Sequence, residues 1–227
     1  MPQRISKFLI ALMVLMAASS AWAADKAKDE ETLRNANTVL HAMLDSNSVP
    51  VDLLGKAECV LVLPGVKKFG FGVGGSGGRG PMLCRTGKKN TWSAPAMYTI
   101  GGVSAGFQVG GSSTDFVLLI MTKKGLDALL AGKTKLGNEA SAAAGPSGAN
   151  ATDVGSDIFT YGRAKGLFAG VSLGSATLEP DKDANARLYG KDISAEAIAV
   201  QNSVPSPASG KPLVDVLNTT TKGAKKP

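Results

Sequence analysis

One segment is more informative than any other in this chain of 227 residues. It reads Cys59-Val-Leu-Val-Leu-Pro-Gly-Val-Lys-Lys-Phe-Gly-Phe-Gly-Val-Gly-Gly-Ser-Gly-Gly-Arg-Gly80. Its first five residues are a continuous β-prone run, Pro64-Gly65 has the composition of a turn, and glycine recurs through the remainder. Glycine inside a strand permits bending and close backbone approach. The segment therefore predicts neighbouring strands in a strongly bent sheet.

Further short β-prone runs follow at close spacing along the chain. They are Lys67 to Gly75, Pro81 to Arg85, Thr91 to Ala94, Met97 to Ile100, Ala105 to Val109, Phe116 to Met121, Ile158 to Tyr161, Gly166 to Leu173 and Ala176 to Leu178. Short strands joined by glycine-rich turns are typical of an antiparallel sheet.

Helical patterns flank these strands. They cover Asp25 to Leu44, a short helix that begins at Pro50, Lys123 to Leu130, Asp181 to Tyr189 with Asp181 as its cap, and Ser194 to Val200. The predicted fold class is therefore α+β, a strongly curved antiparallel sheet or partial barrel with several flanking helices.

The N-terminus has the pattern of a secretory signal peptide. Arg4 and Lys7 precede an apolar run from Phe8 to Ala18, and Ala21-Trp22-Ala23 is a small-x-small cleavage site. We expect residues 1–23 to be removed and the chain to be exported, either periplasmic or secreted, and peripheral to a membrane.

The domain organisation that we expect is simple. A single domain spans residues 24–200. After Gln201 the composition turns to Pro, Ser, Thr and Lys, which predicts a mobile basic tail over 201–227.

Composition limits the chemistry available to the chain. One histidine and two cysteines make clusters of these residues for a metal very improbable, and we expect no cofactor. Cys59 and Cys84 are the only candidates for a disulfide, which an exported chain can keep; two buried thiols on neighbouring strands are the alternative.

Catalytic motifs in the chain are weak. The G-x-S-x-G pattern of serine hydrolases occurs around Ser76, Ser104 and Ser172, as a chain rich in Gly and Ser produces by chance. A hydrolase of that type needs a histidine after the serine, whereas the one histidine, His41, precedes all three. We therefore expect no enzyme, and a serine hydrolase is the least favoured alternative.

The strongest functional signal is a gap in the acidic residues. Lys and Arg number 25 against 18 Asp and Glu, for a net charge of +7, and no acid occurs between Glu58 and Asp115. The gap holds six cations: Lys67, Lys68, Arg79, Arg85, Lys88 and Lys89. Arg163 and Lys165 are two weaker additions. They lie between glycines, just before a segment whose sequence is similar to that of the earlier strands. Glycine-rich backbone with uncompensated cations favours a phosphate-bearing partner.

Ordered motifs over about 160 residues resemble the SYLF domain family. Besides the segment from Cys59 to Gly80, they are Trp92-Ser-Ala-Pro-Ala96, Gly106-Phe-Gln-Val-Gly-Gly-Ser-Ser-Thr-Asp115, Ala144-Gly-Pro146, Gly166-Leu-Phe-Ala-Gly-Val-Ser-Leu173 and Asn185-Ala-Arg-Leu-Tyr-Gly190. The resemblance implies binding of membrane phospholipids, with phosphoinositides and actin filaments linked to eukaryotic members. Because an exported chain would not meet actin, we carry over only the lipid.

These observations together predict a non-catalytic protein that binds anionic phospholipid at the cell envelope, with phosphoinositide-like headgroups as ligands in vitro. The eight cations named above are the predicted headgroup site, to which each Lys or Arg contributes about 1 kcal/mol. Nucleic acid is not an expected partner, because the chain lacks a long basic stripe with interleaved aromatics. The main alternative is a structural or protein-interaction module of the envelope whose partner is unknown.

Overall fold

A computed structural model describes the protein over residues 2–71, 73–87, 91–105, 110–132, 134–136, 142–144, 157–165 and 176–222. The helices are α1 (Pro2–Asp45), α2 (Val51–Lys56), α3 (Lys123–Leu130), α4 (Lys182–Tyr189), α5 (Ala195–Ala199) and α6 (Lys211–Thr220), with a 3₁₀ turn, η1 (Ala208–Gly210). The strands are β1 (Cys59–Phe71), β2 (Val73–Cys84), β3 (Ala96–Ala105), β4 (Gly110–Ile120), β5 (Thr134–Lys135), β6 (Ala142–Ala144), β7 (Ile158–Lys165) and β8 (Thr177–Pro180).

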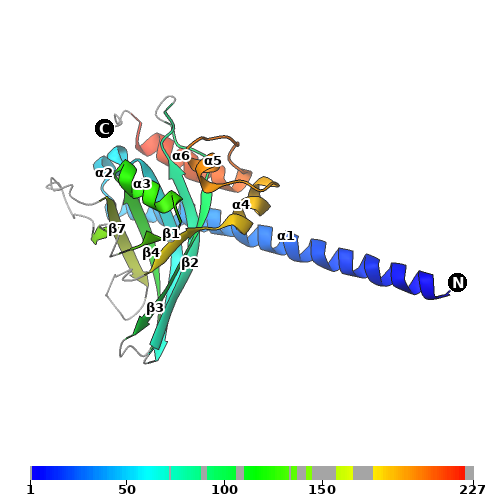
Figure 1. Cartoon of the computed structure of the whole chain (residues 1–227). Helices are drawn as coiled ribbons and strands as arrows, with labels where there is room; N and C mark the ends of the chain where they lie inside the picture. Colours follow the sequence, from blue (N-terminus) through cyan, green and yellow to red (C-terminus); the bar gives the residue numbers. More distant parts are fainter. Residues whose placement is uncertain are drawn as a thin grey trace.

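The strands form one curled sheet in the order β5-β8-β3-β2-β1-β4-β7-β6. Neighbouring strands are antiparallel except for β6, which runs parallel to β7. The long central strands run from an end surrounded by helices to an end that extends beyond them (Figure 1). The predicted class, α+β with a strongly curved antiparallel sheet, is confirmed.

The predicted turn at Pro64-Gly65 is wrong, because β1 continues through it. The register between β1 and β4 shifts between Leu63 and Val66, which marks a bulge. Gly65 has a φ of +58°, and its N–H donates to Oδ1 of Asp115 at 2.9 Å. A bulge accommodates a proline, which has no N–H for the ladder, so two predicted short strands become one long strand.

Other predicted elements have mixed outcomes. The helices at 123–130, 181–189 and 194–200 are confirmed, the second with Asp181 accepting a hydrogen bond from the N–H of Ala184. The run from Thr91 to Ala94 makes only an isolated bridge between Trp92 and Arg85. The predicted strand at 166–173 and most of that at 105–109 lie outside the described residues.

The sheet is covered on both faces at its helical end. On one face, which we call the α3 face, Leu61 and Phe116 pack with Leu126 of α3 and Ile198 of α5. The opposite face, which we call the α1 face, is covered by α1, α2 and α6. Its core comprises Val60, Val62, Val117 and Leu119 from the sheet with Val39, Leu40, Met43, Leu53, Leu54, Leu213 and Leu217 from the helices.

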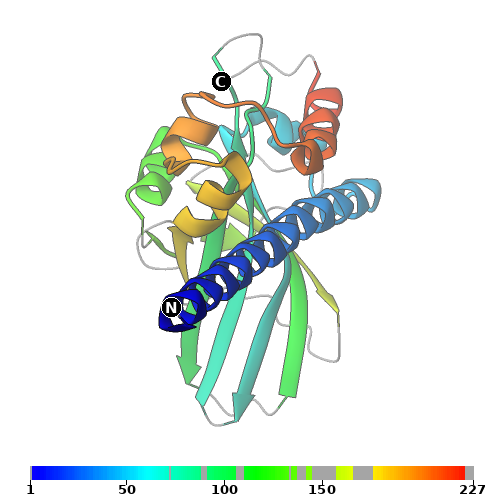
Figure 2. The same cartoon turned by 90° about the vertical axis from the view of Figure 1, so that its right-hand side faces the viewer.

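The predicted helix over residues 25–44 lies within the longer α1, and Leu33 and Leu40 on its apolar stripe are fully buried. Figure 2 shows α1 crossing the strands diagonally, with the outer ends of the central strands extending past it. The predicted cleavage position after Ala23 falls inside α1, and processing there stays a prediction. Within the described part of the chain, no helix combines the length and apolar character needed to cross a membrane.

The predicted mobile tail over 201–227 does not hold for residues 201–222. Leu213 and Leu217 of α6 are fully buried against the α1 face. Thr221 accepts a hydrogen bond from Nε1 of Trp92 at 2.9 Å, and Asn218 accepts one from the Trp92 backbone. The polar composition masked this apolar pair, whose spacing of four residues places both on one side of a helix. The folded unit therefore extends beyond the expected boundary at residue 200.

The sequence motif around Asn185 holds α4 against β3. Asn185 accepts from the N–H of Met97 at 2.7 Å and donates to the Met97 carbonyl at 3.3 Å. Tyr189 donates to the carbonyl of Pro95 at 2.6 Å. Gly190, with a φ of +71°, then ends the helix in the left-handed conformation that glycine favours.

A disulfide joins the first two strands of the chain, which are neighbours in the middle of the sheet. Cys59 on β1 stands opposite Cys84 on β2, and their sulfurs are bonded. Both residues lie in the core of the α3 face.

Candidate functional site

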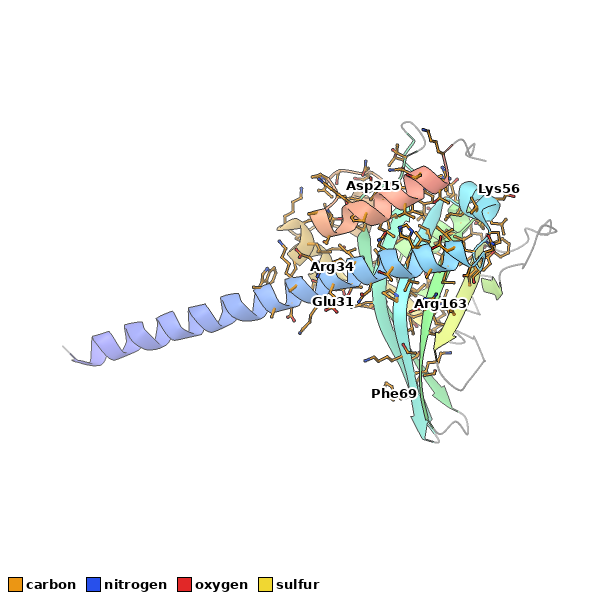
Figure 3. The ribbon with its side chains drawn as sticks, turned by 180° about the vertical axis from the view of Figure 1, so that it is seen from behind. Glu31, Arg34, Lys56, Phe69, Arg163 and Asp215 are labelled. Atoms are coloured by element: carbon orange, nitrogen blue, oxygen red, sulfur yellow. A yellow bond between two sulfur atoms is a disulfide. The ribbon has the colours of Figure 1, made fainter. Side chains whose placement is uncertain are left out.

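The outer part of the α1 face, beyond the cover of α1, presents a cationic side chain together with apolar ones. Val66 packs in the core of the α3 face, so alternation along β1 directs Lys67 and Phe69 toward the α1 face. Figure 3 shows Phe69 near the outer end of the sheet, on the side from which α1 projects. We call this surface the tip face; it comprises Lys67, Phe69, Gly75, Gly77, Gly101, Val103, Gly111 and Ser113.

Two large apolar side chains of the tip face lie in solvent. Phe69 is 67% exposed and Val103 is 74% exposed. Both stand opposite Gly75 in register, on either side of it. A Cβ added at Gly75 would lie 3.3 Å from the Phe69 ring, so the ring lies over this glycine. Phe69 is therefore not a core residue, because no described helix covers this part of the sheet (Figure 2).

Lys67 and Lys68 do not share a face. Lys67 is exposed on the tip face, opposite Gly77 and Ser113. Lys68 is the next residue in the strand and points to the α3 face, opposite Ser76 and Ser112. Partial burial lowers the pKa of the Lys68 ammonium below its ordinary value. Only Lys67 of this pair therefore belongs to the tip face.

Arg79 is part of an internal ion cluster rather than a site for a ligand. Its guanidinium donates to Oδ1 of Asp29 on α1, whose side chain is fully buried, and it lies 3.8 Å from Asp181. Arg187 of α4 donates to the other oxygen of Asp29 at 2.6 Å, and this hydrogen bond raises the pKa of Arg187. Two guanidiniums thus hold one carboxylate, which fastens α1 to β2 and α4.

Arg85 also has a structural role. It donates to the carbonyls of Ala57 and Gly55 at 3.2 and 2.8 Å and stacks over the ring of Trp92 at 4.8 Å. Burial lowers its pKa, an effect that the charge of Glu58 opposes. Arg85 follows the end of β2 that is distant from the tip, roughly 26 Å from the position opposite Lys67 at 3.3 Å per residue. Lys88 and Lys89 lie outside the described residues.

The weaker candidates Arg163 and Lys165 lie on β7. Arg163 donates to Oδ2 of Asp115 at 3.1 Å, and its side chain keeps 36% of its surface exposed. Asp115 is almost fully buried, and its other oxygen holds the bulge at Gly65. Lys165 pairs with Ser113, the residue that also pairs with Lys67. Arg163 borders the tip face (Figure 3), and its single positive charge is paired with Asp115.

The six cations of the acid-free stretch therefore do not form one surface. The structure retains Lys67 at the tip, turns Lys68 to the opposite face, and uses Arg79 and Arg85 internally. Val103 is the tip-face residue that the sequence analysis missed. The pairing of β1 with β2 and of β2 with β3 places Val103 near Phe69. In the sequence, Val103 is distinguished only as an aliphatic residue among small ones.

Groups for catalysis are sparse in the described chain. Of the three candidate serines, Ser172 lies outside the described residues, and Ser76 stands opposite Lys68 and Gly102 in the sheet. His41 is an exposed residue of α1. Among the described residues, no three of His, Cys, Asp or Glu are placed to hold a metal ion.

The geometry defines a class of protein: a curled-sheet α+β domain with a small exposed basic and apolar surface at one end of its sheet. The chain belongs to the Ysc84 family, the SYLF family that its motifs indicated. The family model, described as "Las17-binding protein actin regulator", matches residues 101–220. No solved structure gave a significant match.

The chain is also similar to curated proteins, two of which have names that refer to YSC84 or to LAS seventeen. The chain is 37% identical to an SH3 domain-containing protein of Schizosaccharomyces pombe, over 75% of this chain and 41% of the relative. It is 34% identical to SH3 domain-containing YSC84-like protein 1 of Rattus norvegicus, over 77% of this chain and 52% of the relative. It is 34% identical to LAS seventeen-binding protein 3 of Saccharomyces cerevisiae, over 75% and 38%.

The chain thus spans about half the length of these relatives, or less. Their names refer to an SH3 domain or to binding of another protein, and none of the three names a catalytic activity.

Proposed function

We propose that this protein is a non-catalytic binder of anionic phospholipid and that the tip face is where it meets the membrane. The observation that carries the proposal is the combination of exposed Lys67 with exposed Phe69 and Val103 on one uncovered stretch of sheet. Cationic and apolar side chains together match the two layers of a bilayer surface, phosphates outside and acyl chains beneath.

The charge balance of this end of the sheet supports an anionic partner. β1, β2, β3 and the first residues of β4 contain no acid up to Asp115, and Asp115 is buried against Arg163. Each cation near an anionic surface contributes about 1 kcal/mol. With Lys67 at the tip and the partly exposed Arg163 at its border, we expect reversible binding that weakens as salt screens the charges.

The proposed location is the cell envelope after export. The leader pattern over residues 1–23 supports this, and so does the Cys59–Cys84 disulfide, because disulfides persist in oxidising compartments. The natural ligand would then be an ordinary anionic phospholipid of the envelope. Phosphoinositides would bind in vitro through the same phosphate chemistry.

Vesicle sedimentation tests the proposed function. The full chain is mixed with vesicles of phosphatidylcholine alone and with vesicles that also contain phosphatidylglycerol. We expect co-sedimentation with the anionic vesicles, little with the neutral ones, and a steady loss as salt rises. Equal sedimentation with both compositions, or none with either, would contradict the proposal.

Protein binding is a second candidate, favoured by the comparisons. The family description and the name of the Saccharomyces cerevisiae relative both refer to binding of a protein, Las17 or LAS seventeen. An interaction module of the envelope would use the same exposed surface for a protein partner. Absence of sedimentation with anionic vesicles, in a chain that is folded by circular dichroism, would favour this candidate over lipid.

A further inference from the structure

Phe69 and Val103 form a preformed apolar wedge at the tip. They come from β1 and β3, separated by β2, and Gly75 is the residue between them. The Phe69 ring lies over Gly75, so its position is supported by the sheet before any partner binds. A side chain already held in its bound position loses less conformational entropy on binding.

Next to this wedge, in the row of the sheet that contains Lys67, the neighbouring residues are glycines without side chains. A Cβ added at Gly77 or Gly101 would meet no described atom within 4 Å, and both glycines lie in the same row across the sheet as Lys67. The Lys67 stem therefore has room to lie along the sheet while its ammonium turns toward phosphate, the behaviour called snorkelling.

On the basis of the proposed function, we infer that Phe69 and Val103 penetrate to the acyl chains while Lys67 stays at the level of the phosphates. Lys67 is two residues nearer the body of the protein than Phe69, about 7 Å along the strand at 3.4 Å per residue. The headgroup layer of one leaflet is about 5 to 8 Å thick. The strand thus places its cation and its aromatic ring one headgroup layer apart.

A bilayer fits this wedge better than a second copy of the chain does. A stable dimer buries about 800 Å² on each partner and involves about 20 residues or more. The tip face offers two large apolar side chains among glycines, together with a cation that would repel its own copy. Anionic lipid complements that charge, and a fluid bilayer accommodates a narrow wedge.

Depth-dependent quenching tests the inference directly. Trp92 is buried and Trp22 is exposed, so the full chain with Trp22→Phe has a low accessible background. Phe69→Trp in this background places a fluorophore on the wedge. The matched control is Val51→Trp, which replaces an exposed apolar residue of α2, away from the tip. Vesicles contain phosphatidylglycerol and phosphatidylcholine brominated on the acyl chains.

We expect quenching of the tryptophan at position 69 and none of that at position 51. We also expect Phe69→Ser to weaken vesicle binding about tenfold, by an amount that salt does not change, because apolar burial is not screened. Val51→Ser is the matched control and should bind as the parent chain does.

The outcomes separate this inference from the proposed function. Anionic vesicles that sediment the chain without quenching position 69 would overturn the wedge and leave surface binding of lipid in place. If the parent chain did not sediment with anionic vesicles at all, both the proposed function and the wedge would be overturned. A change in the oligomeric state of Phe69→Ser in the absence of vesicles, seen by analytical ultracentrifugation, would assign the wedge to self-association and overturn the inference.

Discussion

At the scale of single residues, the cations of this chain divide into those that hold the fold and those that face solvent. Arg79 and Arg187 both bind the buried carboxylate of Asp29. Arg85 donates to backbone carbonyls and stacks over an indole ring. Lys67 remains exposed beside Phe69. A count of charges in a sequence therefore overestimates the charge available to a ligand.

Asp29 makes the sharpest residue-scale prediction for stability. Asp29→Ala leaves the guanidiniums of Arg79 and Arg187 without their shared buried counter-charge, which should lower the free energy of unfolding by about 3 kcal/mol or more. Urea denaturation measures the effect. Glu31→Ala, at an exposed position on the same helix, is the control and should change stability little. Equal stability of the two variants would contradict the proposed fastening of α1.

The three tyrosines predict a stability that declines at alkaline pH. Burial raises the pKa of Tyr161 to about 12, and burial raises the pKa of Tyr98 and Tyr189 as well. An unfolded tyrosine ionises near pH 10, so above that pH the folded state binds more protons than the unfolded state. The stability that the buried tyrosines contribute is fully present below about pH 10. It is lost as the pH rises toward their pKa values in the folded state.

The absorbance of tyrosinate measures the ionised fraction of the tyrosines at each pH. The folded chain should show almost no tyrosinate at about pH 10, where the chain unfolded in urea is half ionised. Half ionisation of the folded chain at that pH would mean that the tyrosines are solvated.

Prediction from sequence succeeded at the residue scale where the signal was local. Asp181 was predicted as a helix cap and accepts the expected hydrogen bond. It failed where a partner lies far along the chain: Arg79 meets Asp29 across 50 residues, and Arg187 meets the same carboxylate across 158. Charge alone does not show which of these arginines turns inward.

At the scale of elements, the same contrast separates α3 from β1. The apolar spacing at 123–130 and the stop at Gly132 are contained within one helix, and its bounds agree with the structure. The bulge in β1 depends on Asp115 of β4, which accepts from the N–H of Gly65, so no pattern within 59–71 could have shown it. Sheet elements depend on distant partners more than helices do.

The last helix carries the prediction at this scale. Leu217 of α6 is fully buried on the α1 face, so Leu217→Ala should lower the free energy of unfolding by about 2 to 5 kcal/mol. Lys211→Ala, at an exposed position of the same helix, should have little effect. Thermal unfolding of both variants provides the comparison, and unchanged stability of Leu217→Ala would mean that α6 is not docked.

At the scale of the whole molecule, the two ends of the sheet have different roles. Helices and a disulfide secure one end, where the core lies on both faces. The other end extends past α1 (Figures 1 and 2). It presents the exposed side chains of Lys67, Phe69 and Val103. The fold class and the lipid hypothesis were accessible from sequence motifs, but the position of the candidate surface required the pairing of β1, β2 and β3.

The central claim is that the tip face is the part of the molecule that meets anionic phospholipid. Charge reversal tests it with a matched pair: Lys67→Glu at the tip against Lys211→Glu on α6, two exposed lysines whose changes alter net charge equally. In sedimentation with phosphatidylglycerol vesicles at low salt, Lys67→Glu should weaken binding about tenfold or more, and Lys211→Glu should bind nearly as the parent chain does. Equal weakening by the two variants would mean that attraction is spread over the whole basic protein, which contradicts a lipid site at the tip.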